Sequence, residues 1–268
     1  MQYKVNKILE IDQSSEGILR LLLNDAANKN PLSDKMMMQL KEHLIKASND
    51  NSIRVVIIAA VGDVFCSGHN LKEITYARKN EDGGKSYFLD LFNLCSSLMQ
   101  MIISCSKPVI AEIDGIATAA GCQLVASCDL AIASDSSKFA TPGVNIGLFC
   151  STPMVALSRN VSKKDSMKML LTGDMVDAVE AKRISLINDH VPDDKLNESV
   201  ISLAKKIATK PLSTVKIGKD AFYRQYEMSL SDAYEYTSKV MTINSLSDDA
   251  KEGIISFLEK RDPVWKDD

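Results

Sequence analysis

The 268-residue sequence is poor in the residues and motifs that mark several common functional classes. It contains three histidines (His43, His69 and His190), one tryptophan and seven prolines. The histidines lack the spacing of metal ligands, so we expect no metal site. No Gly-x-Gly-x-x-Gly follows a predicted strand, and no Gly-x-Ser-x-Gly is present. These absences argue against a dinucleotide-binding dehydrogenase and against a serine hydrolase.

Long runs of one residue class are also absent. No stretch approaches 18 uninterrupted apolar residues, so we expect no membrane span. No basic run exists and the net charge is −3, which argues against a nucleic-acid partner. The start, MQYKVNKILEIDQ, has neither an apolar core nor an Arg-rich amphipathic pattern. We therefore expect no signal or transit peptide, and a cytoplasmic location.

None of the cysteines forms a Cys-x-x-Cys pair, and most lie among apolar neighbours. This pattern predicts reduced, mostly buried thiols. The six are Cys66, Cys95, Cys105, Cys122, Cys128 and Cys150.

What the sequence does contain is an alternation of strand and helix patterns. Hydrophobic residues make up 45% and charged residues 25%, enough apolar material for a real core. Two strands are predicted within 7–23. Further strands are predicted at 53–60, 108–114 and 129–134, and helices at 34–48, with Ser33 as N-cap, and 86–104. This order predicts an α/β fold with a mostly parallel sheet up to about residue 150, followed by a helical region.

Two loops follow the predicted strands 53–60 and 108–114, and each opens a helix. The first contains Phe65-Cys66-Ser67-Gly68-His69-Asn70, and the second runs from Gly115 to Gln123 and is rich in Gly and Ala. The N–H groups at the head of a helix have no helical partner, and small residues allow close approach. The loops are therefore either tight packing turns or a pair of converging donors for a developing oxyanion.

Three segments resemble signatures of the enoyl-CoA hydratase/isomerase (crotonase) superfamily. They are FCSGHNLKE after its strand, PVIAEIDGIATAAGCQLVASCDLAIAS, and the C-terminal EGIISFLEKRDPVW. The resemblance implies a spiral of ββα repeats with a C-terminal helical trimerisation region, which we divide at 1–200 and 201–268. It also implies an enzyme of fatty acid metabolism that acts on acyl-CoA, assembles as a homotrimer or hexamer, and uses no cofactor beyond the coenzyme A of its substrate.

The resemblance also assigns site residues. The backbone N–H groups of His69 and Ala120 are expected to form the oxyanion hole, and Lys260 is expected to meet the nucleotide phosphates, from its own or a neighbouring subunit. The other residues expected to line the CoA and acyl path are Ala27, Asn28, Lys29, Cys66, Gly68, Asn70, Leu71, Lys72, Gly121 and Pro142.

One departure from the family pattern changes the expected chemistry. Hydratases of this family use two glutamates, and here Gln123 and Gly143 occupy those positions. Some members instead carry an aspartate further on, where this chain has Ser151. An amide cannot take a proton from water, so efficient hydration by the usual route is not expected. One branch of the family shares both missing carboxylates.

Three hypotheses therefore stay open. The chain is a hydratase-like enzyme, an enzyme for isomerisation, decarboxylation or thioester hydrolysis, or a non-catalytic acyl-CoA-binding oligomer. His69 is the best substitute base by residue type, whereas Cys66 and Cys150 are weaker candidates as nucleophiles. Glu73, one turn into the helix after the first loop, is expected to be a solvated or a helix-start charge.

Overall fold

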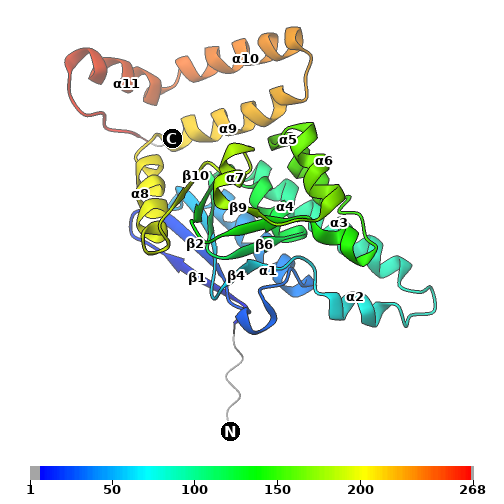
Figure 1. The fold of residues 1–268 in the computed structure, drawn as a ribbon. Coiled ribbons are helices and arrows are strands. Elements are labelled where there is room, and N and C mark those ends of the chain that lie inside the picture. Colours follow the sequence, from blue (N-terminus) through cyan, green and yellow to red (C-terminus); the bar gives the residue numbers. More distant parts are fainter. Residues whose placement is uncertain (1–6, 267–268) are drawn as a thin grey trace.

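Two β-sheets, built from successive ββα units, form the centre of the chain in a computed structural model that describes residues 7–266 (Figure 1). The larger sheet has the order β1 (Leu9–Gln13), β2 (Ile18–Leu23), β3 (Val55–Ala60), β5 (Val109–Ile113), β7 (Leu130–Ser134) and β10 (Asp189–Val191). The smaller sheet has the order β4 (Val64–Cys66), β6 (Ile116–Thr118), β8 (Lys138–Ala140) and β9 (Val176–Asp177).

Neighbouring strands run parallel in both sheets except at one edge of each. β1 pairs antiparallel with β2, and β9 pairs antiparallel with β8. Each of the pairs β3–β4, β5–β6 and β7–β8 gives one strand to each sheet before the chain enters a helical segment. This arrangement confirms the predicted α/β spiral of ββα repeats.

The three parallel strands of the smaller sheet correct the sequence interpretation. Residues 64–66 and 116–118 were expected in loops, and 138–140 in no strand, but they form β4, β6 and β8. Each is three residues long, too short for alternation to be recognised. The longer elements lie within two residues of their predicted bounds.

Helices cover the larger sheet on both faces. The main core includes buried residues of α1 (Asp34–Asn49), α3 (Lys85–Ser104) and α4 (Ala120–Ser127). On the other face, Leu196, Val200 and Ala204 of α8 (Leu196–Ala208) pack against Ile18 and Val55. The predicted boundary between residues 200 and 201 thus falls within α8, and the division into two domains stays a prediction.

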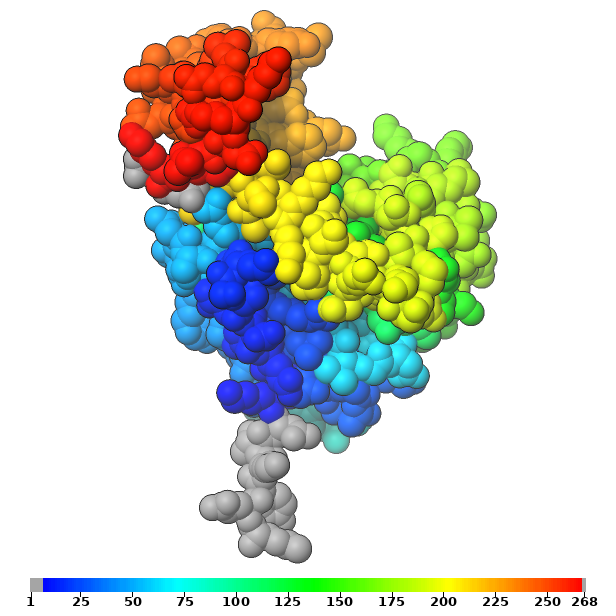
Figure 2. Space-filling view, turned by 90° about the vertical axis from the view of Figure 1, so that its left-hand side faces the viewer, coloured from blue at the N-terminus to red at the C-terminus, as the bar shows by residue number. Residues whose placement is uncertain are grey.

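The remaining helices surround this core. They are η1 (Ala26–Asn28), α2 (Leu71–Ala77), η2 (Pro142–Ile146), α5 (Pro153–Asn160), α6 (Lys163–Thr172), α7 (Ala178–Arg183), η3 (Asp193–Lys195), α9 (Leu212–Tyr226), α10 (Leu230–Ser245) and α11 (Asp248–Glu259). The last three form an arm beyond α8, the orange and red lobe of Figure 2. A buried ion pair between Lys219 of α9 and Asp129, 2.6 Å apart, joins the arm to the core.

One described helix, α3, is long and apolar enough by composition to cross a membrane. Its inner side buries Leu91, Cys95 and Leu98, and it packs between α1 and α4. Core helices of globular domains meet the same criterion, so this helix is weak evidence for a membrane span.

Candidate functional site

The two small-residue loops meet directly. A β-carbon on Gly68 would lie 2.9 Å from Cβ of Ala119 and 3.2 Å from the amide nitrogen of Ala120. The Thr118 hydroxyl donates a hydrogen bond to the carbonyl of Ser67 at 3.2 Å, which ties the loops together. The amide that follows Gly68, that of His69, therefore lies on a loop in contact with the one that carries Ala120.

The backbone at Ala119 is strained in a way that orients the next amide. Ala119 has φ 51° and ψ −118°, a conformation that an L side chain rarely adopts, and its own N–H donates to Ala140 at 2.9 Å. Ala120 then begins α4, where amides have no helical acceptor. Within residues 7–266, neither the Ala120 amide nor that of His69 donates a hydrogen bond to protein. Strain of this kind is concentrated at functional sites.

The segment 27–29 lies beside the first loop. The amide of Ser67 donates to the carbonyl of Lys29 at 3.2 Å, and Lys72 reaches the side-chain oxygen of Asn28 at 3.5 Å. Ala27, Asn28 and Lys29 are exposed, as are Leu71 and Lys72 at the start of α2. Two lysines and an amide side chain thus border an accessible surface next to the loops.

The cysteines of the loops are poor nucleophiles. All six cysteines of the chain are free and buried, which confirms the predicted pattern. Burial raises the pKa of Cys66 to about 12, and burial also raises the pKa of Cys150. A thiol with such a pKa stays protonated near neutral pH, so nucleophilic catalysis by Cys66 is not supported.

Gln123 and Gly143 both lie in the interior. Gln123 is on the all-buried helix α4, and its side-chain oxygen accepts a weak hydrogen bond from the Cys95 thiol at 3.7 Å. Gly143 lies in η2 after Pro142, where a β-carbon would be 2.5 Å from the carbonyl oxygen of Leu148. Residue 143 therefore lacks a carboxylate, and the backbone around it leaves no room for one.

Ser151 lies at the end of the segment that follows Gly143. It is exposed, and its hydroxyl donates to the carbonyl of Phe149 at 3.4 Å. No charged partner accompanies this bond, so Ser151 is not activated as a base.

Glu73 lies in the first turn of α2, which agrees with the expected helix-start charge, but it is not fully solvated. It is half-buried, and its Oε2 atom is enclosed without a hydrogen bond of ordinary geometry. Asp34 of α1 and Tyr87 of α3 lie beside it, and burial followed by the charge of Asp34 raises the pKa of Glu73. The N3 position of a helix gave a signal for this, because a side chain there points back toward the N-cap.

The ring of His69 belongs to the same surroundings. Both ring nitrogens are buried without a hydrogen bond of ordinary geometry, and the ring meets Phe92 edge-on at 5.6 Å between centroids. Burial lowers the pKa of His69, while the backbone of Leu32 and then the nearby charge of Asp34 oppose that shift. His69 is therefore a neutral imidazole near pH 7.

Lys260 lies in the arm, away from the two loops. It is exposed at the end of α11 with a left-handed backbone (φ 56°). Figure 1 places α11 in the arm, on the opposite side of the molecule from α2. A contact between Lys260 and a ligand at the loops would require a neighbouring subunit.

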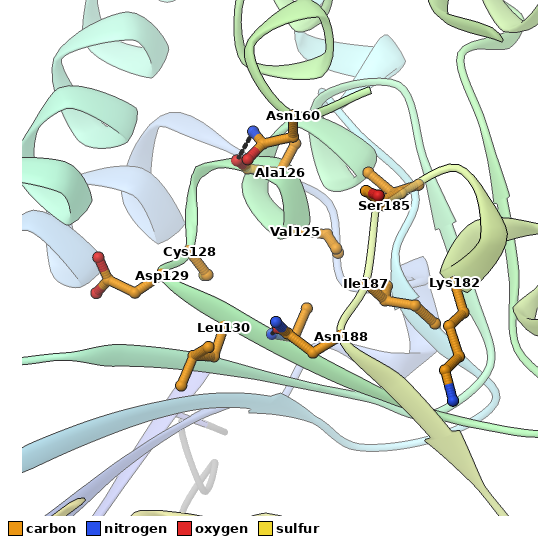
Figure 3. A pocket seen from close by; sticks show the side chains of 12 residues that line it. Val125, Ala126, Cys128, Asp129, Leu130, Asn160, Lys182, Ser185, Ile187 and Asn188 are labelled. Carbon is orange, nitrogen blue, oxygen red and sulfur yellow. Dashed lines mark hydrogen bonds between the residues drawn. The ribbon is translucent and has the colours of Figure 1, made fainter. Parts of the chain in front are cut away.

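One surface pocket lies away from the loops. About 370 Å³ in volume, it lies at the carboxyl end of α4, whose amino end holds Ala120 (Figure 3). Both of its amide side chains already have partners: Asn160 donates to Ala126 at 2.8 Å, and Asn188 accepts from Ala131 at 2.7 Å. We assign it no part in the chemistry. Among the described residues, no group of three or more His, Cys, Asp or Glu side chains is arranged for a metal.

The sequence and the fold of this chain are similar to those of known proteins. The family model for enoyl-CoA hydratase/isomerase matches residues 13–268. A Xenopus laevis protein, "Enoyl-CoA hydratase domain-containing protein 3, mitochondrial", is 48% identical over 96% of this chain and 86% of the relative. The crystal structure of human enoyl-CoA hydratase domain-containing protein 3 superimposes with a TM-score of 0.92 at 44% identity, covering 97% of this chain and all of that one. The Escherichia coli 2,3-dehydroadipyl-CoA hydratase is 30% identical over 94% of this chain and 96% of its own length.

The relatives overturn the predicted cytoplasmic location. Similar proteins from Xenopus laevis, Rattus norvegicus, Mus musculus and Homo sapiens are all described as mitochondrial. Neither the composition nor the first residues of this sequence indicated a mitochondrial location.

Proposed function

Because this chain belongs to the enoyl-CoA hydratase/isomerase family, we propose that it binds acyl-CoA thioesters and stabilises a thioester enolate between the amides of His69 and Ala120. The observation that carries this proposal is the contact of Gly68 with Ala119 and Ala120, which brings the two donor loops together. A donor placed for a developing oxyanion contributes about 3–4 kcal/mol to the transition state.

Coenzyme A enters as part of the substrate, and we propose no resident cofactor. Lys29, Asn28 and Lys72 are exposed beside the first loop and suit the polar end of such a ligand. We propose that Cys66, Gly68, Asn70 and Gly121 line the path of the thioester.

Hydration by two carboxylates is not part of this proposal. Gln123 and Gly143 supply no general base, so the oxyanion-binding site would instead serve isomerisation or decarboxylation, which pass through a thioester enolate, or thioester hydrolysis, which passes through a tetrahedral oxyanion. A non-catalytic acyl-CoA-binding oligomer is the second candidate, and the buried, weakly bonded side chain of Gln123 favours it over hydration.

We propose a homotrimer or a dimer of trimers as the assembly. The arm exposes large apolar side chains that a monomer would leave in water: Phe222, Tyr226, Leu230, Tyr234, Met241, Ile243, Leu246, Ile254, Phe257 and Leu258. Apolar surface of this extent marks a contact with another chain. In such an assembly Lys260 of one subunit would meet the phosphates held by the next.

Calorimetric binding of an acyl-CoA thioester tests the site. Gly68→Ala should weaken binding at least tenfold, because its β-carbon would push the Ala120 loop away. Gly83→Ala is the matched control, since Gly83 also has a positive φ (67°) but no neighbour within 4 Å of an added β-carbon. Equal affinities for the two variants, or no binding by the unaltered protein, would remove the proposal. Loss of the conjugated absorbance of crotonyl-CoA then distinguishes turnover from binding alone.

A further inference from the structure

We propose that residues 261–266 form a strap that holds α11 with its polar side inward, so that an apolar stripe of α11 faces a second copy of the chain. The stripe consists of Ile254, Phe257 and Leu258. This inference rests on the proposed assembly, and it assigns control of that assembly to the residues that follow α11.

Helix α11 is oriented in the opposite way to an ordinary surface helix. Its apolar side chains Ile254, Phe257 and Leu258 are 58%, 83% and 73% exposed. Because they are spaced three and four residues apart, they lie on one face of the helix. Among the described residues, those that α11 buries are Asp249 and Ser256. A surface helix normally turns its apolar face to its own core, so the exposed stripe indicates a surface for another chain.

The chain reverses direction at Lys260 and runs back along the polar side of α11. Lys260 has a left-handed backbone (φ 56°), and the Arg261 amide donates to the carbonyl of Ser256 at 3.0 Å. The Lys266 amide then donates to the carboxylate of Asp249, in the first turn of α11, at 2.9 Å. The strap therefore runs from the carboxyl end of α11 to its amino end.

One carboxylate in the middle of α11 holds the strap. Arg261 forms a two-pronged ion pair with Glu252, with N–O distances of 2.6 and 2.9 Å. The Val264 amide donates to the same carboxylate at 2.9 Å. Arginine–carboxylate pairs of this geometry are the stronger kind of surface ion pair, because two parallel N–H···O bonds form together. Glu252 is thereby neutralised on the inner side of its helix.

Trp265 connects the strap to the root of the arm. It is the single tryptophan of the sequence, and its indole N–H donates to the carbonyl of Thr209, between α8 and α9, at 2.9 Å. Its ring lies 3.3 Å from where a β-carbon on Gly253 would be. A second link comes from Ser213 of α9, whose hydroxyl donates to Asp249 at 2.8 Å. Figure 1 shows the segment after α11 returning to the beginning of α9, so polar contacts, not an apolar core, fix α11 there.

A second copy of the chain fits the stripe because one chain carries both halves of a contact. The stripe belongs to the arm, whose helices α9 and α10 also expose large apolar side chains. The core exposes a separate apolar segment, whose side chains are 38–61% exposed: Val144, Ile146, Leu148 and Phe149. Two different apolar surfaces on one chain join copies head to tail, and a rotation that closes gives a ring.

Sedimentation velocity of the purified 268-residue chain over a range of concentrations tests this inference. Truncation after Lys260 removes the strap and should leave monomers where the unaltered protein assembles. Arg261→Gln removes the two-pronged pair with Glu252 and should raise the dissociation constant of the assembly at least about tenfold. Arg183→Gln is the matched control, because Arg183 of α7 makes a similar pair with Glu180, at 2.6 and 2.7 Å, outside the arm. It should assemble as the unaltered protein does.

A variant of the stripe separates its role from that of the strap. Phe257 is 83% exposed, so Phe257→Asp should fold normally but stay monomeric. Adding Arg261→Gln to this monomer should move the Trp265 emission to longer wavelength, because the indole leaves Gly253 and Thr209 for water. The far-ultraviolet circular dichroism should change little, whereas a residue that supported the whole fold would lower it.

Each outcome decides the inference. Unchanged assembly of the folded strap variants, or unchanged Trp265 emission in the double variant, overturns the role of the strap and leaves the proposed assembly standing. An unaltered protein that stays monomeric overturns both, while the acyl-CoA site is judged separately by calorimetry. Loss of assembly in Arg261→Gln and Phe257→Asp, with Arg183→Gln unaffected, supports the assignment, and Arg261→Gln decides it if the truncated chain does not fold.

Discussion

Gly121 packs so closely against Cys66 that a β-carbon on Gly121 would lie 2.2 Å from the carbonyl oxygen of Cys66. Gly121 is the second residue of α4, and Cys66 ends β4. The close approach sets the distance between the helix that begins at Ala120 and the strand that leads to His69. The donor geometry of the candidate site therefore depends on a glycine that itself donates nothing to the ligand.

Gly121→Ala should lower the free energy of unfolding by about 3 kcal/mol or more, because the contact is with backbone and cannot relax by a rotamer change. Gly218→Ala in α9 is the control. Gly218 has no neighbour within 4 Å of an added β-carbon, so alanine should stabilise its helix by about 0.5–1 kcal/mol. Denaturant unfolding measures both values, and similar effects at the two glycines would contradict this account of the packing.

Gly143→Glu should destabilise the chain without creating a hydratase. The new β-carbon would meet the Leu148 carbonyl at 2.5 Å and the Cys150 sulfur at 2.8 Å, so η2 must move. Gln123→Glu keeps its shape and should leave the fold intact, but one buried carboxyl alone should give little hydration. Unfolding and the decay of crotonyl-CoA absorbance test both variants. Rapid hydration by Gly143→Glu at unchanged stability would show that the loop adapts.

Asp129→Ala should destabilise attachment of the arm by about 3–5 kcal/mol, because it leaves the buried ammonium of Lys219 without its carboxylate. Asp129 also accepts hydrogen bonds from Tyr223 at 2.8 Å and from the Val109 amide at 2.7 Å. Glu235→Ala is the control, since its pair with Lys239 has side chains about 70% exposed and contributes about 0–1 kcal/mol. Proteolysis and unfolding curves report the difference, and equal effects would show that the buried pair is dispensable.

His69→Phe should reduce the amount by which the free energy of unfolding decreases as the pH falls. Burial lowers the pKa of His69 in the folded chain below its ordinary value of 6.5, so the unfolded chain binds the proton first as pH falls. Stability is therefore lost from about pH 6.5 down to the folded pKa, and phenylalanine abolishes this contribution. Unfolding curves from about pH 8 to about pH 5 measure the slope. His43→Phe serves as comparison, because burial lowers that pKa as well; an unchanged slope in His69→Phe would contradict the prediction.

Sequence patterns were sufficient where a requirement is local. Ser33 caps α1 by accepting from the Met36 amide at 3.2 Å, as its position predicts. The β-branched run at 53–60 gave β3, and the Gly- and Ala-rich loops were recognisable because close backbone approach leaves few alternatives to small residues. Strands of three residues carried no such signal, so the smaller sheet emerged only in three dimensions.

The sequence by itself determined which chemistry is missing: a glutamine and a glycine stand at residues 123 and 143, and no fold can make either a base. Tertiary structure alone decided the surroundings of Glu73, which depend on Asp34 and Tyr87 from distant parts of the chain. It also decided that Gly143 has no room for a side chain and that Lys260 lies in the arm. Residue type determines whether a group can bind a proton at all. The pH at which it binds the proton depends on burial and on neighbouring charges, and these arise only when separate elements pack together.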